Sequence, residues 1–204
     1  MTVRHIVFDI GNTLIEGYPE RIYLERIQDR VARKRFLTEV CTPEWHLEQD
    51  RGRSWEDAEA VLITKYPEEA DLIRAYRANF WNDLVVGEIS GTVVIFDELL
   101  SMAVDVTGLT NWASDTWAET PARFPLVNRF RGVTVSSHIG LIKPDPAIFR
   151  HHEVAFYLDP DATLLIDDSL RNVEGAKAVG WSALHYTDPA HLRVDLRRYG
   201  FPLR

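Results

Sequence analysis

The sequence predicts an α/β fold: a doubly wound parallel sheet with helices on both faces and a small α-helical block inserted after the first strand. From residue 91 onward, short β-branched runs alternate with helix-like stretches, and such alternation places parallel strands in one covered sheet. Between residues 19 and 88 the chain instead shows helical periodicity, many charges and no convincing strand. We therefore expect a core of residues 1–17 and 89–204, with residues 18–88 as a separate helical unit.

The first predicted strand ends in an acid. Ile6, Val7 and Phe8 form an apolar run typical of a buried strand, and Asp9 follows directly, before a Gly-Asn-Thr loop at residues 11–13. In open α/β sheets ligands bind at the carboxyl ends of the strands, so Asp9 is a candidate reactive carboxylate. An aspartate there could equally cap the following turn through its side-chain oxygens. This segment alone leaves both interpretations open.

The inserted block is predicted to be a series of amphipathic helices that pack on the rest of the chain. Apolar residues spaced among charges predict a helix over residues 21–38, and Pro43 begins a second one. Ser54 and Asp57 resemble a capping box at the start of a third helix, and Pro67 opens a fourth that runs towards Trp81.

The elements after residue 91 follow in regular order. Strands are predicted at residues 104–109, 133–135, 163–166 and 182–185, and helices at residues 92–102, 116–127, 146–156, 173–179 and 189–199. Polar side chains follow several of these strands. Thr110 and Asn111 come after one, Asp167 and Asp168 after another, and Lys143 precedes a helix.

Parallel topology would bring these polar residues to one edge of the sheet. The three carboxylates of Asp9, Asp167 and Asp168 would repel one another unless a cation lay among them, and oxygen ligands suit magnesium. The hydroxyl, amide and ammonium groups nearby are those that phosphoryl oxygens require. Each residue alone is more typical of a turn or a solvated surface, but together they predict a magnesium site beside a phosphate site.

Composition narrows the class of protein. The chain has 204 residues and a formal net charge of −8, which argues against a nucleic-acid partner because phosphate backbones are bound by basic surfaces. Cys41 is the only cysteine, which suits a reducing compartment. The first strand follows Met1 too closely for a signal peptide, and no apolar run is long enough for a bilayer, so we expect a cytoplasmic protein without a membrane partner.

Four motifs resemble, in order, those of the haloacid dehalogenase superfamily of hydrolases. They are F-D-I-G-N-T-L at residues 8–14, L-T-N at 109–111, G-L-I-K-P-D-P-A-I-F at 140–149 and L-L-I-D-D-S-L-R-N-V-E-G-A at 164–176. The resemblance extends along the whole core and implies that it is Rossmann-like. Within the superfamily the chain most resembles small helical-capped phosphatases with a D-x-G-N first motif, which include sugar-1-phosphate phosphatases. Residues 48–55 are similar to the E-R-G-containing segment of their cap.

The resemblance implies a magnesium-dependent phosphatase acting on a small phosphorylated metabolite, as a monomer or homodimer. Asp9 would be the nucleophile that forms an aspartyl-phosphate, which water then hydrolyses. Magnesium would be held by Asp9, the Gly11 carbonyl and Asp168, with help from Asp167. The phosphate site would consist of Thr110, Asn111 and Lys143, with Asn111 supporting its loop, and Asp9, Thr110 and Lys143 would be the catalytic residues.

Gly11 departs from the family pattern. Most phosphatases of the superfamily carry a second aspartate two residues after the nucleophile, which donates a proton to the leaving group. Without it we expect slow turnover, an intrinsically good leaving group such as an anomeric phosphate, or a donor from elsewhere. Asp50, Glu48 and Glu16 are the candidate donors.

Substrate contacts are predicted in the cap. We expect Trp45, Asp50 and Arg51 to meet the substrate, since an aromatic beside a charge pair suits a polar metabolite, although Trp45 could equally belong to the cap core. His151 and His152 lie on the predicted helix 146–156, and we expect both to be solvated.

Two alternatives stay open. A 2-haloacid dehalogenase-like enzyme also needs no proton donor, because halide leaves unprotonated, but such enzymes carry Ser and Asn where this chain has Asp167 and Asp168. A catalytically weak relative would keep the magnesium and phosphate sites with little turnover.

Overall fold

The computed structural model describes residues 2–204. Its centre is a five-stranded parallel sheet in the order β5-β4-β1-β6-β7. The strands are β1 (His5–Phe8), β4 (Asp105–Thr110), β5 (Val133–Val135), β6 (Thr163–Asp167) and β7 (Ser182–His185). The predicted α/β class is confirmed, and each predicted strand is present with ends that differ by no more than one residue.

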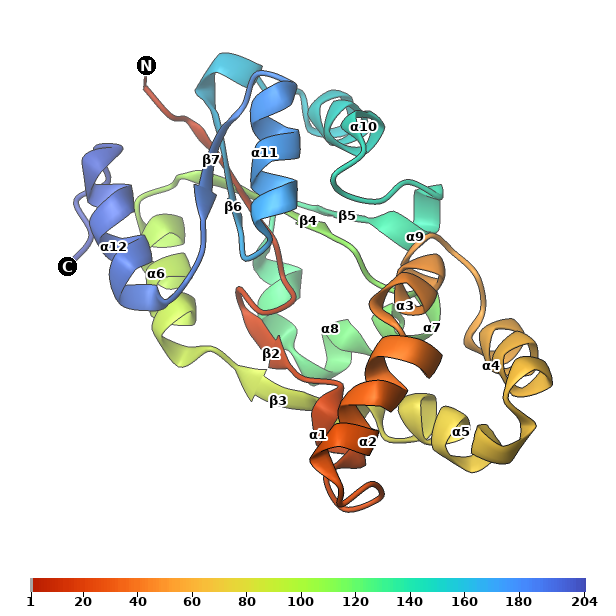
Figure 1. Ribbon diagram of the computed structural model, residues 1–204. Coiled ribbons are helices and arrows are strands. Elements are labelled where there is room, and N and C mark those ends of the chain that lie inside the picture. The colour runs from red at the N-terminus through yellow and green to blue at the C-terminus, as the bar shows by residue number, and fades with distance from the viewer. Residues whose placement is uncertain (1) are drawn as a thin grey trace.

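Helices cover both faces of the sheet (Figure 1). Alternate side chains of β1 face opposite layers: Phe8 packs in one core cluster with Phe96 of α6 (Ser90–Ser101), and Val7 in a second cluster with Phe149 of α10 (Pro146–Phe156). Helix α12 (Pro189–Arg198) joins the first layer and α11 (Leu170–Ala178) the second. A strand covered on both sides has no polar face, which explains the continuous apolar run before Asp9.

The strand order sets the position of the candidate site. The chain moves from β1 to β4 and β5 on one side of the sheet and then returns to β6 on the other side of β1. Phe8 is in register with Gly108 of β4 and Ile166 of β6. The residues just after these three positions therefore meet at a topological switch point, where open α/β sheets bind ligands.

The inserted block is helical, as predicted, but its first helix is interrupted. Asp29 caps a new helix through its side chain, so the helix predicted over residues 21–38 is two helices and a π-helical turn. Ser54 accepts the N–H of Asp57, which confirms the predicted helix start there. The elements are α1 (Glu20–Tyr23), α2 (Arg30–Arg35), the π-helical turn (Phe36–Val40), α3 (Pro43–Asp50), α4 (Trp55–Lys65), a 3-10 turn (Pro67–Glu69), α5 (Ala70–Ala78) and a second π-helical turn (Phe80–Leu84).

A two-stranded antiparallel ribbon links the block to the sheet. It pairs β2 (Ile15–Gly17) with β3 (Val85–Glu88), so the expectation of no strand between residues 19 and 88 is wrong at β3. β3 is short, half-exposed and contains Gly87, and its partner lies some seventy residues away, so no local pattern identifies it. Both expected boundaries of the helical unit fall at this ribbon, and the division into core and helical unit stays a prediction.

The remaining elements are short. They are α7 (Ser114–Trp117), α8 (Thr120–Arg123), α9 (Ser136–Ile139) and 3-10 turns at Pro125–Arg129 and Pro160–Ala162. Within residues 2–204, every helix is too short or too polar to cross a lipid bilayer.

Candidate active site

Three carboxylates meet at the carboxyl edge of the sheet. Asp9 follows β1, Asp167 ends β6 and Asp168 comes next, and one carboxylate oxygen from each lies within 4.8 Å of the others. Asp9 and Asp167 are buried, whereas Asp168 is partly exposed. Oxygen ligands gathered at this spacing fit a hard divalent cation, because such an ion offsets the repulsion between the acids.

Lys143 already offsets part of that repulsion. Its Nζ lies 2.9 Å from Asp9 Oδ1 and 2.7 Å from Asp167 Oδ2, and it donates to the carbonyl oxygen of Leu109 at 2.7 Å. Burial by itself lowers the pKa of Lys143, but the carboxylates of Asp167 and Asp9 raise it above its ordinary value. The side chain, 2% exposed, is therefore a charged ammonium between two acids.

Asp167 is more tightly held than its neighbour. Besides Lys143, it accepts from the Ser169 N–H at 2.9 Å and from the Asn172 side-chain amide at 3.0 and 3.2 Å. Asp168 is more exposed than Asp167. Its partial burial raises its pKa, and the nearby charge of Asp167 raises that pKa further. The fixed Asp167 therefore orients Lys143, and Asp168 is the acid that is better placed to meet a ligand from solvent.

Asp9 is in an environment that disfavours its negative charge. Burial raises its pKa, Lys143 lowers it, and the charges of Asp167 and Asp168 raise it again, so the net direction is upward. Its Oδ1 also accepts the N–H of Ile10 at 2.7 Å. A cation among the three carboxylates would reverse the upward shift, because it favours their ionised forms.

The loop after Asp9 has a fixed shape. Asn12 adopts a left-handed backbone conformation (φ 51°), which asparagine tolerates better than most residues, and its N–H donates to the carbonyl of Ile15 at 2.7 Å. Its side chain accepts the N–H of Gly17 at 3.0 Å. Asn12 therefore holds the loop that contains Gly11 beside the acid cluster.

Thr110 and Asn111 lie where β4 ends, as predicted. The Thr110 hydroxyl is fully buried and has no hydrogen-bond partner among residues 2–204. An unpaired buried hydroxyl is costly, and this one remains free to donate a hydrogen bond to a ligand. The Asn111 side chain exchanges two hydrogen bonds with the backbone of Lys143, at 2.9 and 3.1 Å. Asn111 thus supports the Lys143 loop with both its amide atoms.

The three predicted cap contacts differ in position. The Trp45 ring packs on Trp55 and Tyr76 and donates to the carbonyl of Ala58, which agrees with the alternative that it belongs to the core of the inserted block rather than to the cavity wall. Arg51 lies 3.7 Å from Glu48 and is half-exposed outside the cavity. Asp50 alone of the three lines the cavity.

Asp50 is a buried carboxylate with free hydrogen-bonding capacity. It is 4% exposed, and its Oδ1 accepts no hydrogen bond from the described residues, although His46 Nε2 lies 3.7 Å away. Burial raises the pKa of Asp50, against opposing effects of His46 and Lys143. His46 is in turn paired with the Tyr76 hydroxyl at 3.0 Å. His46 and Tyr76 were not among the predicted site residues. They lie on separate helices, so no sequence motif with a fixed spacing connects them.

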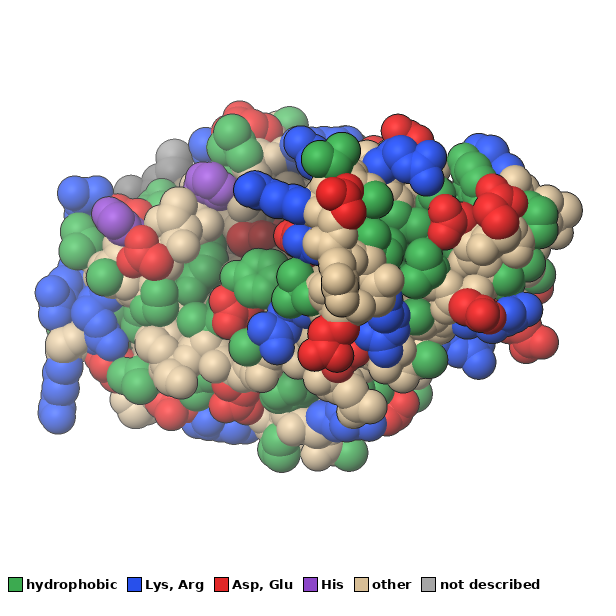
Figure 2. All heavy atoms as spheres, turned by 60° about the horizontal axis from the view of Figure 1, so that its bottom comes forward, with side chains coloured by type: hydrophobic (Ala, Val, Ile, Leu, Met, Phe, Trp, Pro, Cys, Tyr) green, Lys and Arg blue, Asp and Glu red, His purple; other side chains and the backbone are tan. Residues whose placement is uncertain are grey.

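Ser136 connects Asp50 to the sheet. Its hydroxyl donates to the carbonyl of Asp50 at 2.6 Å and accepts the N–H of Trp112 at 3.0 Å. Sequence reasoning missed this serine because its two partners come from distant segments. Figure 2 shows the hollow between the two parts of the molecule, with acidic side chains in its depth.

Comparison with known proteins identifies relatives. A sesquiterpene phosphatase of Aspergillus oryzae is 32% identical over 103 residues, which are 50% of this chain and 52% of that protein. The match therefore spans about half the length of this curated relative.

Solved structures resemble the whole chain. A HAD family enzyme from Bacteroides thetaiotaomicron has a TM-score of 0.74 at 21% identity, over 95% of this chain and 99% of the other. The same enzyme with magnesium and inorganic phosphate has a TM-score of 0.70 at 22% identity, over 93% and 98%. L-2-haloacid dehalogenase from Xanthobacter autotrophicus has a TM-score of 0.65 at 19% identity, over 96% and 83%. At these identities the likeness shows the fold.

The family model for haloacid dehalogenase-like hydrolases matches residues 6–185, from the first strand of the sheet to the last. This range contains all four motifs that carried the resemblance. The chain therefore belongs to the haloacid dehalogenase-like hydrolase family.

Proposed function

We propose that this protein is a magnesium-dependent phosphoric monoester hydrolase acting on a small phosphorylated metabolite. The observation that carries the proposal is the unpaired Thr110 hydroxyl and the Lys143 ammonium beside three clustered carboxylates. The name of the phosphatase relative and the magnesium and phosphate bound by a protein of the same fold support it. In this proposal residues 18–88 form a cap over a core of residues 1–17 and 89–204.

Asp9 is the nucleophile in this proposal. One of its carboxylate oxygens forms a bond to phosphorus while the bond from phosphorus to the ester oxygen breaks, and water later cleaves the aspartyl-phosphate. Asp9, Asp168 and the Gly11 carbonyl would hold magnesium, with Asp167 nearby. Bound there, the ion supplies positive charge that neutralises phosphoryl oxygens. Thr110 donates its free hydroxyl to a phosphoryl oxygen, and Lys143 beside Asp9 adds positive charge.

Gly11 stands where most phosphatases of the superfamily have a proton-donating aspartate. We infer that Asp50 donates the proton instead. Of the three candidate donors, Glu48 is exposed and paired with Arg51, and Glu16 accepts the Tyr18 hydroxyl at 2.6 Å. Asp50 is buried in the cavity wall, is free at Oδ1 and has a pKa that burial raises, which favours its protonated form. It would protonate the departing ester oxygen.

Replacing Asp50 with asparagine is expected to slow hydrolysis of esters with poor leaving groups. The rate with an alkyl phosphate should fall by about 10² to 10⁴, the usual contribution of a positioned general acid, whereas an aryl phosphate should be little affected because its leaving group departs without a proton. Turnover of both esters is measured in parallel for Asp50→Asn. Glu48→Gln, on the same helix but exposed, is the matched control and should behave as the parent.

Equal loss on both esters would contradict a role in proton transfer. It would instead indicate that the Asp50 carboxylate helps to keep the inserted block in place, for example through its contact with His46.

Magnesium is expected to raise the melting temperature, and by more at higher pH. Without the ion, the raised pKa of Asp9 means that the folded state holds a proton more tightly than the unfolded chain, so this stabilising contribution is complete at low pH and is lost as pH rises through the pKa of the folded state. Magnesium binds the ionised carboxylates, so its affinity increases over the same range. At about a hundred times Kd the gain should be roughly 5 to 10 °C near pH 8 and smaller near pH 5.5.

Thermal denaturation with magnesium or with potassium at equal ionic strength measures this shift. Asp168→Asn should reduce it strongly. A shift that is the same at both pH values would show that the ion binds away from Asp9 and Asp168.

The direct test is hydrolysis of an aryl phosphate with and without magnesium. Metal-dependent release of phosphate is the expected result. Release of halide from a 2-haloacid without metal would instead favour a dehalogenase, although the acidic pair Asp167 and Asp168 beside Asp9 speaks against a second anionic substrate without a cation. A folded, magnesium-binding protein that hydrolyses neither substrate would be a non-catalytic relative.

A further inference from the structure

A large cavity lies between the inserted block and the loops that follow β1 and β4. Its volume is about 890 Å³, which lies within the range of small-molecule sites. Gly11 and Asn111 line its inner end beside Asp9 and Thr110, and Leu24 and Leu37 line it near α1 and α2. The cavity therefore borders the two loops beside the proposed phosphate site and is much larger than a phosphate group.

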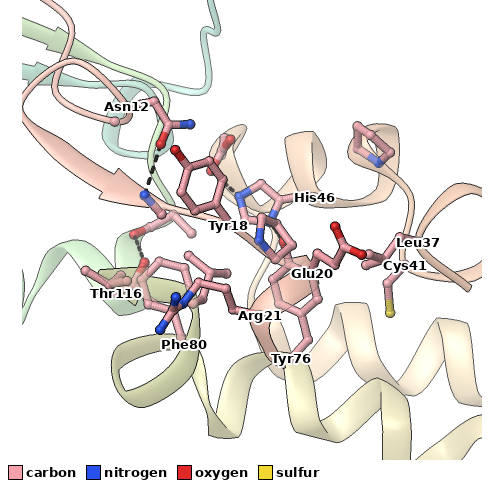
Figure 3. Close-up of a pocket in the computed structure, with 18 of the residues that line it drawn as sticks. Asn12, Tyr18, Glu20, Arg21, Leu37, Cys41, His46, Tyr76, Phe80 and Thr116 are labelled. Carbon is pink, nitrogen blue, oxygen red and sulfur yellow. Dashed lines mark hydrogen bonds and ion pairs between the residues drawn. The ribbon is translucent and has the colours of Figure 1, made fainter. Parts of the chain in front are cut away.

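The walls beyond the phosphate end are mostly aliphatic and aromatic. Tyr18, Tyr76 and Phe80 turn their rings towards the same space (Figure 3). Leucine and valine side chains complete these walls, and two of the large apolar side chains, Tyr18 and Leu24, are each 49% exposed at the surface. Apolar surface left open in a pocket of this size indicates an apolar ligand.

Most polar side chains that line the cavity already have partners within the protein. Arg21 donates to the carbonyl of Asp83, Glu20 pairs with Arg33, and the Thr116 hydroxyl donates to Ala113. The polar residues described above are likewise engaged: Asn12 with Gly17, Tyr18 with Glu16, His46 with Tyr76, and Asn111 with Lys143.

Buried polar atoms without a partner are found near the phosphate end. Among the described residues that line the cavity, these atoms are Asp50 Oδ1 and the indole nitrogen of Trp112, which follows Asn111 directly. A sugar would bring several hydroxyl groups against walls that are mostly apolar, and each hydroxyl that found no partner there would lose its hydrogen bonds to water. The cavity is therefore polar where the ester oxygen would lie and apolar beyond it.

We propose that the cavity selects phosphate monoesters of apolar alcohols, with a long alkyl or terpenoid chain, over sugar phosphates. The phosphate lies at Thr110 and Lys143, the ester oxygen faces Asp50, and the hydrocarbon chain extends between Tyr18, Phe80 and the leucines. This inference rests on the proposed phosphatase function and specifies its substrate class. It replaces the sugar phosphate that the D-x-G-N motif suggests.

The chain-length dependence of turnover tests the proposal. With magnesium present, kcat/KM is measured for butyl, octyl and dodecyl phosphate, for farnesyl phosphate and for glucose 1-phosphate, all below their micelle concentrations. We expect kcat/KM to rise by up to about fourfold per added methylene until the cavity is filled, following the free energy of burying one CH₂ group. Farnesyl and dodecyl phosphate should exceed glucose 1-phosphate by at least about tenfold.

A polar substitution in the apolar wall should weaken the preference for long chains. Leu47 of α3 is half-buried in the cavity wall and outside the two hydrophobic core clusters, so Leu47→Gln removes apolar wall surface with little effect on folding. We expect it to lower the ratio of dodecyl to butyl phosphate turnover by about fivefold. Val61→Gln, on the exposed face of α4 away from the cavity, is the matched control and should leave the ratio unchanged.

Two different failures can be told apart. A flat chain-length profile, or preference for glucose 1-phosphate, would overturn the apolar specificity and leave the phosphatase function standing. Absence of turnover with every ester, an aryl phosphate included, would contradict the proposed phosphatase function. The inference about its substrate class would then be wrong as well.

Discussion

Asp9→Asn is expected to abolish phosphate release. The amide keeps the shape of the carboxylate and can still accept the N–H of Ile10, but it is too weak a nucleophile to attack phosphorus. Turnover should fall by at least about 10⁴, as happens when a covalent nucleophile is removed. Steady-state release of phosphate from an aryl phosphate measures the loss, and mass spectrometry of a rapidly quenched reaction shows whether a phosphorylated protein forms in the parent and not in the variant.

The fold should survive this change, because Lys143 keeps its contact with Asp167. Asp161→Asn, at an exposed position beside β6, is the matched control and should retain full activity. Substantial turnover by Asp9→Asn would show that a different group attacks phosphorus, or that water attacks directly.

Lys143→Met is expected to reduce both stability and activity. Methionine is similar in length but carries no charge, so Asp9 and Asp167 would face each other without the ammonium that lies 2.9 and 2.7 Å from them. Removing one partner of a buried ion pair costs about 3–5 kcal/mol of unfolding free energy, which corresponds to roughly 10 °C in melting temperature for a chain of this size. Loss of a fixed charge at the phosphoryl group should lower turnover by about 10² to 10³.

Magnesium provides a further readout for this variant. Because the ion would supply some of the missing positive charge, it should stabilise Lys143→Met by more than it stabilises the parent. Lys177→Met, which removes an exposed lysine paired with Glu174, should change neither property. A Lys143→Met protein with parent-like stability would mean that the two carboxylates are protonated without the lysine and need no counter-charge.

The edge of the sheet was predictable from the sequence because its signals are local. An apolar run that ends in an acid identifies β1 and Asp9, and the same pattern identifies β6 and Asp167. Parallel strands place both acids at the same edge of the sheet, and the pairing of β1 with β6 in the structure makes them neighbours. The same argument placed Thr110 and Lys143 beside them, so the core of the site followed from topology.

The walls of the cavity were not predictable in the same way. Trp45 and Asp50 lie five positions apart on one short helix, and only packing against other helices decides that the tryptophan is core and the aspartate lines the cavity. The burial of Asp50 depends on Ser136, 86 residues later. Contacts between segments so far apart in the sequence do not change the spacing of apolar residues along the chain, so that spacing cannot predict them.

His152 illustrates the same limit. Its position on a helix with charged neighbours predicts a solvated side chain, and that expectation is wrong. The ring is fully buried, and its two nitrogens pair with Thr107 at 2.9 Å and Thr134 at 2.8 Å. Burial lowers its pKa to about 3, so the imidazole is neutral and serves as a structural bridge between α10 and the sheet.

The β2–β3 ribbon has a mechanical consequence. Both passages of the chain between the sheet and the inserted block run through this one hydrogen-bonded pair, so any swinging of the block has to twist or bend the ribbon as a hinge. Residues of both strands, among them Glu16 and Val85, also line the cavity. The ribbon is therefore both the connection between the two parts of the chain and a part of the cavity wall, so bending it would change the shape of the cavity.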